Sequence, residues 1–258
     1  APVTVTFTIT PSANGCPGTP FTATVLVNPT PNVTANGTLN SICSDLETVI
    51  ILNSDLAGTT YNWTRDNTVA VTGMPAAGNG SIPGSITGVL TNTTQTNVLV
   101  TFNITSSAGG CAGTPFTALI TVHPIPSVND PVDQVVCNNT QTAPVAFTGS
   151  PAANGFNWTN NNTGIGLFTH GFGNISAFTA VNTGVSPAIA NVIVTPRYLD
   201  AATANLCFGS PQTFTITVNP TPNAIATPAS QTICSGANIT TIALTGGVSS
   251  TMYSWARN

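Results

Sequence analysis

The sequence repeats itself with a period of about 96 residues, and this repeat restricts the fold more than any other feature. The stretch "CPGTPFTATVLVNPTP" (16–31) returns as "CAGTPFTALITVHPIP" (111–126) and again as "CFGSPQTFTITVNPTP" (207–222). A second cysteine (43, 137, 234) and a tryptophan (63, 158, 255) keep the same spacing. Three independent landmarks that share one period indicate a tandem array of domains.

Within each repeat, apolar positions recur at every second residue. Residues 3–9 and 98–104 both show this alternation, which predicts strands with one buried and one solvated face. Residues 21–27 and 116–122 continue the pattern after "PSANG" and "SSAGG", whose composition predicts a hairpin turn. No segment shows a convincing helical period with caps. The sequence therefore predicts an all-β protein.

Short strands, frequent turns and about 96 residues per repeat are typical of an immunoglobulin-like β-sandwich. In each repeat the tryptophan follows, by about a dozen residues, a pair of apolar residues two positions apart. We expect the pair on the second strand of the sandwich and the tryptophan on the third, with its indole ring in the core. The pairs are Ile50 and Leu52, Val145 and Phe147, and Ile242 and Leu244, and the tryptophans are Trp63, Trp158 and Trp255.

Proline-rich joints separate the repeats at "NPTPN" (28–32), "HPIPS" (123–127) and "NPTPN" (219–223). Alternating prolines favour extended, semi-rigid backbone, so each joint should be short and stiff. We expect a segment cut from a longer array, with a partial domain at each end. The predicted domains are 1–28 (the last strands of a truncated sandwich), 29–123 and 124–219 (complete sandwiches), and 220–258 (the first strands of a truncated sandwich).

The landmarks resemble a known family. "NPTPNAIATPASQTICSGANITTIALTGG" (219–247), followed by "YSW" and by the "GCPGTP" of another repeat, resembles the PKD-like repeats of very large secreted proteins of the Bacteroidota. Such repeats occur in gliding-motility adhesins and related cargo of type IX secretion. The resemblance implies PKD-like sandwiches at the cell surface. The third repeat departs from the pattern, with "RYLDAATANLC" before its hairpin cysteine and Asn160 where Arg65 stands in the second.

The composition argues against several classes of partner. Charged residues are 4% of the chain, with three arginines and no lysine, and the net charge is −4. Three arginines cannot neutralise a run of phosphates, so we expect no nucleic acid as a partner. No apolar stretch approaches the roughly 20 residues of a membrane span, so we expect no membrane insertion. Hydrophobic residues are 41%, which together with the low net charge predicts a packed fold.

Catalytic chemistry is not expected from this chain. A nucleophile needs a base within hydrogen-bond reach, and the only histidines are His123 and His170. His123 occupies the joint position that Asn28 and Asn219 fill elsewhere, which favours an ordinary joint residue. His170 lies in the glycine-rich "GLFTHGFGN" (166–174), which predicts a loop. We therefore predict no enzyme activity and no cofactor.

Metal and phosphate sites are not predicted either. Asp130 and Asp133 lie beside a joint, but calcium requires more oxygen ligands than this pair supplies. Two cysteines per repeat without a nearby histidine do not match a zinc site. The glycine-rich stretches "GNGSIPG" (78–84) and "GFGNIS" (171–176) carry no lysine and open no helix, so they predict turns.

The six cysteines predict disulfides of an extracellular protein. In each repeat one cysteine lies in the hairpin and the other before the second strand, at ends of the sandwich that a strand of about eight residues holds roughly 25 Å apart. Since a disulfide needs Cα atoms within about 7 Å, we favour a disulfide bond between domains, from Cys43 to Cys207. We call such an interdomain disulfide a strap. Intradomain pairing of Cys43 with Cys111, and of Cys137 with Cys207, stays open as the alternative. In the strap arrangement, partners outside this segment are expected for Cys16, Cys111 and Cys234.

These features favour a structural function. We expect a repeat segment of an extracellular adhesin stalk or surface filament that supplies reach and mechanical cohesion, with each repeat adding about 35–45 Å. Its partners would be neighbouring repeats, like chains in a filament, or a surface or glycan ligand. Two alternatives stay open. A carbohydrate-binding sandwich would bind sugars through exposed aromatic side chains, and a multi-chain fibre would form readily at low charge.

Overall fold

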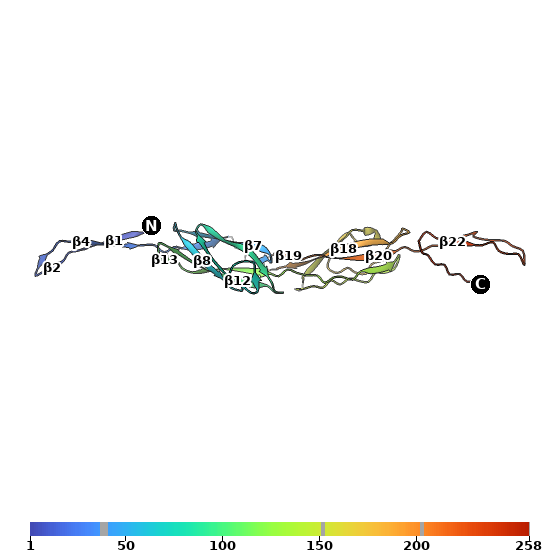
Figure 1. Cartoon of the computed structure of the whole chain (residues 1–258), viewed down its shortest axis with the longest axis horizontal. Helices are drawn as coiled ribbons and strands as arrows, with labels where there is room; N and C mark the ends of the chain where they lie inside the picture. Colours follow the sequence, from blue (N-terminus) through green and yellow to red (C-terminus); the bar gives the residue numbers. More distant parts are fainter. Residues whose placement is uncertain (37–40, 151–152, 202–203, 258) are drawn as a thin grey trace. The chain divides into compact units, whose positions relative to one another are not determined.

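The computed structural model describes residues 1–36, 41–150, 153–201 and 204–257 (Figure 1). In this part of the chain the regular secondary structure is β-strand, apart from one 3₁₀ helix, η1 (Thr163–Ile165), which confirms the all-β prediction. The chain forms two compact units, and the predicted boundaries of four domains stay predictions. Unit 1 comprises Ala1–Ile125 with Asp200–Asn205, and unit 2 comprises Pro126–Leu199 with Leu206–Asn258.

Unit 1 contains a sandwich of two sheets. One sheet has the strand order β10-β8-β12-β14-β6, and the other has the order β5-β7-β11-β9. Neighbouring strands are antiparallel except β14 and β6, which run parallel. The strands are β5 (Val33–Asn36), β6 (Ser41–Cys43), β7 (Leu46–Ser54), β8 (Thr60–Arg65), β9 (Val71–Thr72), β10 (Ala77–Ser81), β11 (Gly84–Asn92), β12 (Val98–Ala108), β13 (Cys111–Ala112), which pairs with β12, and β14 (Phe116–His123).

The core of unit 1 is built by the predicted alternation. On β12, Val100, Phe102 and Ile104 are fully buried, while the residues between them are more exposed. Trp63 on β8 is 8% exposed and packs against Phe102, with ring centroids 5.7 Å apart. Leu52 on β7 closes the core from the facing sheet. The tryptophan of this repeat thus lies between the two sheets, where burial of its large apolar surface stabilises the sandwich.

Two glycines that the sequence placed in turns lie in strands, opposite the tryptophans. Gly78 on β10 pairs with Trp63, and Gly171 on β17 (His170–Phe172) pairs with Trp158. A Cβ atom on Gly78 would lie 2.7 Å from Nε1 of Trp63, and one on Gly171 would lie even closer to the other indole. The turn prediction is wrong here because glycine leaves room for a large ring on the neighbouring strand.

The N-terminal hairpin of unit 1 consists of β1 (Val3–Ile9) and β4 (Phe21–Val27), with the short strands β2 (Ser12–Ala13) and β3 (Cys16–Pro17) at its tip. Asn14 and Gly15 both have positive φ, 50° and 79°, as the tight turn of a hairpin requires. Gly109 and Gly110, between β12 and β13, also have positive φ. Both predicted hairpins are therefore confirmed.

Unit 2 contains a sheet with the strand order β15-β20-β18-β16-β17. Trp158 is 7% exposed, and Phe147 contacts both Phe156 and Phe214, with ring centroids 5.6 and 6.2 Å apart. These rings form the centre of a second core. The strands are β15 (Gln134–Cys137), β16 (Gly155–Asn160), β17, β18 (Ala188–Leu199), β19 (Leu206–Phe208), which pairs with β18, and β20 (Gln212–Asn219).

The predicted second strand of this repeat does not form a ladder. Val145 makes only an isolated bridge to Ile175, and the backbone N–H of Phe147 donates to Oδ1 of Asn174 at 2.9 Å. Both side chains are buried as expected, but Pro144 supplies no N–H for a ladder. The strand assignment is wrong for this pair.

The C-terminal part of unit 2 contains one strand pair, β21 (Ile225–Thr227) with β22 (Ala243–Thr245). Trp255 is 83% exposed, so the prediction of a core residue is wrong for it in this structure. Trp63, by contrast, lies beside β12, where it pairs with Ile104 and packs against Phe102. The structure describes no counterpart of β12 within residues 220–257.

Candidate functional site

The most unusual polar group of unit 1 is His123, at the end of β14. Its side chain is fully buried, with Nδ1 3.0 Å from Oδ1 of Asn97 and Nε2 3.2 Å from Oδ2 of Asp200. Burial lowers the pKa of His123, and the carboxylate of Asp200 raises it by a smaller amount, so the net shift is downward. Cys43 lies opposite His123 in register, but it is disulfide-bonded and offers no thiolate nucleophile. The contact between His123 and Asp200 joins the end of β14 to residues 200–205 within unit 1.

We expect the lowered pKa of His123 to make unit 1 less stable in acid. Below about pH 6.5 the unfolded histidine binds a proton more readily than the buried one, so the free energy of unfolding should fall between pH 7.5 and 5.5. His123→Asn, which copies Asn28 and Asn219, should reduce this dependence. Hydrogen exchange of β14 amides at both pH values measures it. His170→Asn, in unit 2, is the control and should leave the exchange of the β14 amides in unit 1 unchanged; equal effects of both variants would contradict the assignment to His123.

The other polar candidates do not assemble into a site. His170 lies on strand β17, paired with Thr159, so the loop predicted for it is wrong; its side chain is exposed, and its Nδ1 lies 3.2 Å from the hydroxyl of Thr169. Oδ1 of Asp133 accepts a hydrogen bond from the backbone N–H of Thr215 at 2.6 Å. Within the described ranges, no group of three or more histidine, cysteine or acidic residues could hold a metal ion.

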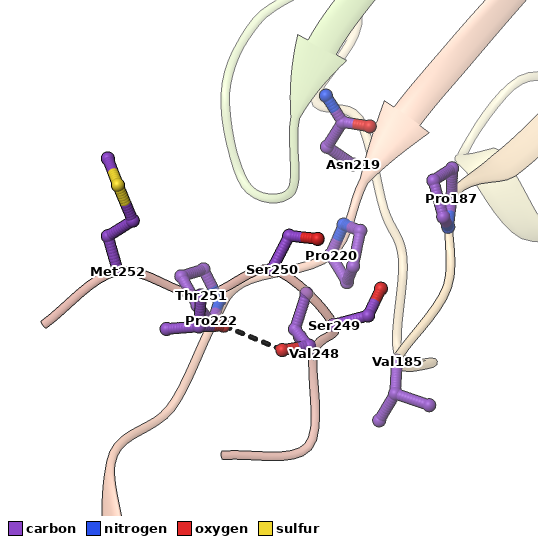
Figure 2. Close-up of a pocket in the computed structure, with 10 residues that line it drawn as sticks. All are labelled: Val185, Pro187, Asn219, Pro220, Pro222, Val248, Ser249, Ser250, Thr251 and Met252. Atoms are coloured by element: carbon purple, nitrogen blue, oxygen red, sulfur yellow. Dashed lines mark hydrogen bonds between the residues drawn. The ribbon is translucent and has the colours of Figure 1, made fainter. Parts of the chain in front are cut away.

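Unit 2 has a shallow cavity of about 390 Å³ beside β20 (Figure 2). The hydroxyl of Thr251 donates to the carbonyl of Val248 at 2.7 Å, which ties the loop on one side of the cavity. None of the lining residues is titratable, so the cavity offers no acid, base or nucleophile of strong reactivity. They are Val185, Pro187, Asn219, Pro220, Pro222, Val248, Ser249, Ser250, Thr251 and Met252.

Arg65 holds a loop of unit 1 together. It is 6% exposed, and its guanidinium group donates to the carbonyls of Pro75 (3.0 Å), Val71 (2.9 Å) and Met74. Burial lowers its pKa, but an arginine remains charged near neutral pH. Its role is therefore to satisfy backbone carbonyls that have lost contact with water.

Asn160 takes over this role in unit 2, where it occupies the position equivalent to Arg65. Its Nδ2 donates to the carbonyls of Asn162 (3.1 Å), Leu167 (3.1 Å) and Phe168 (3.2 Å). The sequence showed the exchange of residue types at this position. It did not show that both side chains bind loop carbonyls.

A buried asparagine also recurs in both units, and the sequence analysis missed it. Nδ2 of Asn92 donates to the carbonyls of Val122 and Thr96, both at 2.8 Å, while Oδ1 accepts from the N–H of Thr94. Asn182 makes the equivalent three bonds in unit 2. The available signal was an Asn-Thr pair shortly before the strand that leads into each hairpin.

Asn92→Ala should lower the free energy of unfolding of unit 1 by about 2–3 kcal/mol, because buried backbone groups lose their partners. Asn62 on β8 is exposed, so Asn62→Ala is a matched control that should change stability by less than about 0.5 kcal/mol. Hydrogen exchange of β12 and β14 amides compares the two variants. A similar small effect for both would mean that water replaces the lost bonds.

Two of the six cysteines, Cys43 and Cys207, are disulfide-bonded, and the other four are free thiols. Intradomain pairing with Cys111 or Cys137 is therefore wrong for this structure. The register explains why: Cys43 lies opposite His123, at the end of β14, whereas Cys111 lies in the hairpin that leads into β14. In the same way Cys137 and the hairpin strand β19 lie at opposite ends of β20 in unit 2.

Comparison with known families supports the PKD-like assignment for part of the chain. The sequence profile of the PKD-like domain matches residues 1–31 and 40–126, that is, the N-terminal hairpin and most of the rest of unit 1. Among curated proteins, none matches the chain. No helix within the described ranges has the length and apolar character required to cross a membrane.

Several solved structures of multidomain proteins are distantly similar. The FN1–FN3 domains of chicken CNTN1 match with 11% identity over 84% of this chain and 75% of that one, at a TM-score of 0.32. Immunoglobulin domains 1–4 of Sidekick-1 match with 11% identity over 73% and 48% of the two chains, at a TM-score of 0.37. Native Escherichia coli alpha-2-macroglobulin matches with 8% identity over 86% and 20%, at a TM-score of 0.33.

Proposed function

We propose that the chain is a repeat segment of an extracellular adhesin stalk or surface filament, of the kind found in gliding-motility adhesins. The observation that carries this proposal is the tandem repetition of one sandwich sequence, with PKD-like character over residues 1–31 and 40–126. Repeats that stack in one dimension give length in proportion to their number. The polar side chains of the repeats are mostly uncharged.

Disulfide straps between domains belong to this proposal. Cys43 and Cys207 are bonded while the other four cysteines are free, which supports a bond between these two. Such a strap would carry tension past the proline-rich joint "HPIPS" (123–127). Peptide mapping without reduction tests it, because a peptide pair other than Cys43 with Cys207 would contradict the strap.

Electron microscopy of the isolated chain tests the structural function. We expect elongated particles that lengthen by about 35–45 Å for each repeat added by tandem duplication. Compact particles whose length does not grow with the number of repeats would contradict a stalk. The same preparations tested for surface binding would show whether adhesion resides in these repeats.

The alternative function, carbohydrate binding, needs aromatic side chains that sugars can reach. Trp63 and Trp158 are buried in the two cores and cannot serve as such a platform. Screening of the chain against soluble glycans separates the two functions. Specific binding that is lost on mutation of an exposed aromatic residue such as Phe168 would favour the sugar-binding function over the structural one.

A further inference from the structure

A second cavity of unit 2, of about 310 Å³, is lined in part by Trp158. The side chain of Trp158 is 7% exposed, and its Nε1 is a buried donor without a hydrogen-bond partner among the described residues. A buried indole N–H normally has an acceptor, because burying it without one costs free energy. Within the same described ranges, Nε1 of Trp63 in unit 1 is not among the buried polar atoms that lack a partner. The unpartnered indole donor therefore distinguishes unit 2 from unit 1.

Most hydrogen-bond acceptors around this cavity are already occupied. Oδ1 of Asn174 accepts from the backbone N–H of Phe147 at 2.9 Å, whereas no hydrogen bond of its Nδ2 is described. Four lining residues have carbonyls that accept hydrogen bonds from other parts of unit 2, namely Leu167, Phe168, Ile175 and Phe178. The cavity therefore offers a ligand mainly donors, from Nε1 of Trp158 and Nδ2 of Asn174.

The rest of the lining is apolar and partly aromatic. Leu167 and Ile175 are buried, Phe178 is half-buried, and Phe168 is 82% exposed, so a ligand can reach its ring. None of the described residues that line the cavity carries a charge. These properties favour a neutral ligand with an apolar body and exposed acceptors.

We propose that this cavity binds a proline-rich segment of a partner protein in the polyproline II conformation. A prolyl residue has a carbonyl acceptor but no N–H donor, which fits a site whose acceptors are occupied and whose donors are open. Its ring is apolar and uncharged, and proline-rich segments dock in grooves lined by aromatic side chains. In the complex, Nε1 of Trp158 donates to a carbonyl of the segment, and a prolyl ring packs against Phe168. A cavity of this volume is at the small end of ligand sites, which suits a single ring.

A sugar ring fits the same cavity less well. Each of its hydroxyl groups brings a donor as well as acceptor capacity. Since most acceptors of the lining already have partners, a buried sugar hydroxyl would leave its donor unpaired, at a cost in binding free energy. A proline-rich segment has no such donors to pair.

The experiment titrates the ¹⁵N-labelled chain with a hexaproline peptide that is acetylated at its N-terminus and amidated at its C-terminus. The indole N–H signal of Trp158, assigned with a Trp158→Phe variant, should shift with peptide concentration, while those of Trp63 and Trp255 stay in place. Phe168→Ser should weaken binding about tenfold, because the prolyl ring loses its aromatic contact. Val132→Ser, at a similarly exposed site in unit 2 (81%), is the control and should leave binding unchanged.

Three results would overturn the proposal. The first is an unshifted Trp158 signal at millimolar peptide, which would mean that water alone occupies the cavity. The second is binding that Phe168→Ser leaves unchanged, and the third is a larger shift with glucose or with a Gly-Ser peptide of the same length than with hexaproline. The inference goes beyond the stalk function, whose test is the length gained per repeat, so either can fail alone.

Discussion

Replacing Arg65 with alanine is expected to lower the free energy of unfolding of unit 1 by about 3–5 kcal/mol. The loss combines the hydrogen bonds from a charged donor with the cost of leaving the carbonyls of Val71 and Met74 buried without a partner. Hydrogen exchange of the β8 and β12 amides measures the change. Arg65→Lys should recover only part of the stability, since one ammonium group cannot reproduce the planar set of donors.

Arg197 in unit 2 is the matched control for this prediction. Its guanidinium carbon lies 4.2 Å from the centre of the Phe172 ring, a contact worth about 0.5–1 kcal/mol at a partly exposed site. Arg197→Ala should therefore destabilise unit 2 much less than Arg65→Ala destabilises unit 1. Similar losses of stability in the two variants would mean that water solvates the loop carbonyls once Arg65 is truncated. The proposed role of Arg65 in holding the loop would then be wrong.

The strands and hairpin turns could be predicted from the sequence, because each depends on residues that lie close together in the chain. The alternation over residues 98–104 placed Phe102 in the core, and the Asn-Gly and Gly-Gly pairs gave the hairpin turns. Both outcomes follow from the period of a strand and from the backbone angles that glycine and asparagine tolerate. Such features are encoded within a few residues of each other.

The interactions that the sequence analysis missed join residues far apart in the chain. Asn92 binds the carbonyl of Val122, and His123 meets Asp200, which belongs to the lengthened turn of the next repeat. The periodic pattern of the sequence does not predict such pairs. A backbone carbonyl such as that of Val122 can belong to any residue type, so the sequence does not mark it as an acceptor. The prediction for Trp255 failed for a related reason: the burial of Trp63 depends on β12, a strand from a later part of the chain, and the structure describes no counterpart of β12 within residues 220–257.

Removing the disulfide of Cys43 and Cys207 is expected to have the other large effect on stability. If these two residues are bonded to each other, as we propose, the bond closes a loop of more than 160 residues. The chain-entropy model gives about 5 kcal/mol for closing a loop of this length. Urea unfolding of Cys43→Ser with Cys207→Ser, compared with the native chain, measures the loss. Cys16→Ser with Cys137→Ser removes two free thiols instead and should be nearly neutral.

The same bond should limit how far the chain extends under force. While the strap is intact, the residues between Cys43 and Cys207 cannot be stretched, because tension passes through the disulfide. Reduction should then release about 550 Å of additional contour length, at roughly 3.4 Å for each residue. Single-molecule pulling from the two chain ends, with and without reductant, measures this gain. An equal contour length in both conditions would show that Cys43 and Cys207 are not bonded to each other, and the proposed strap would be rejected.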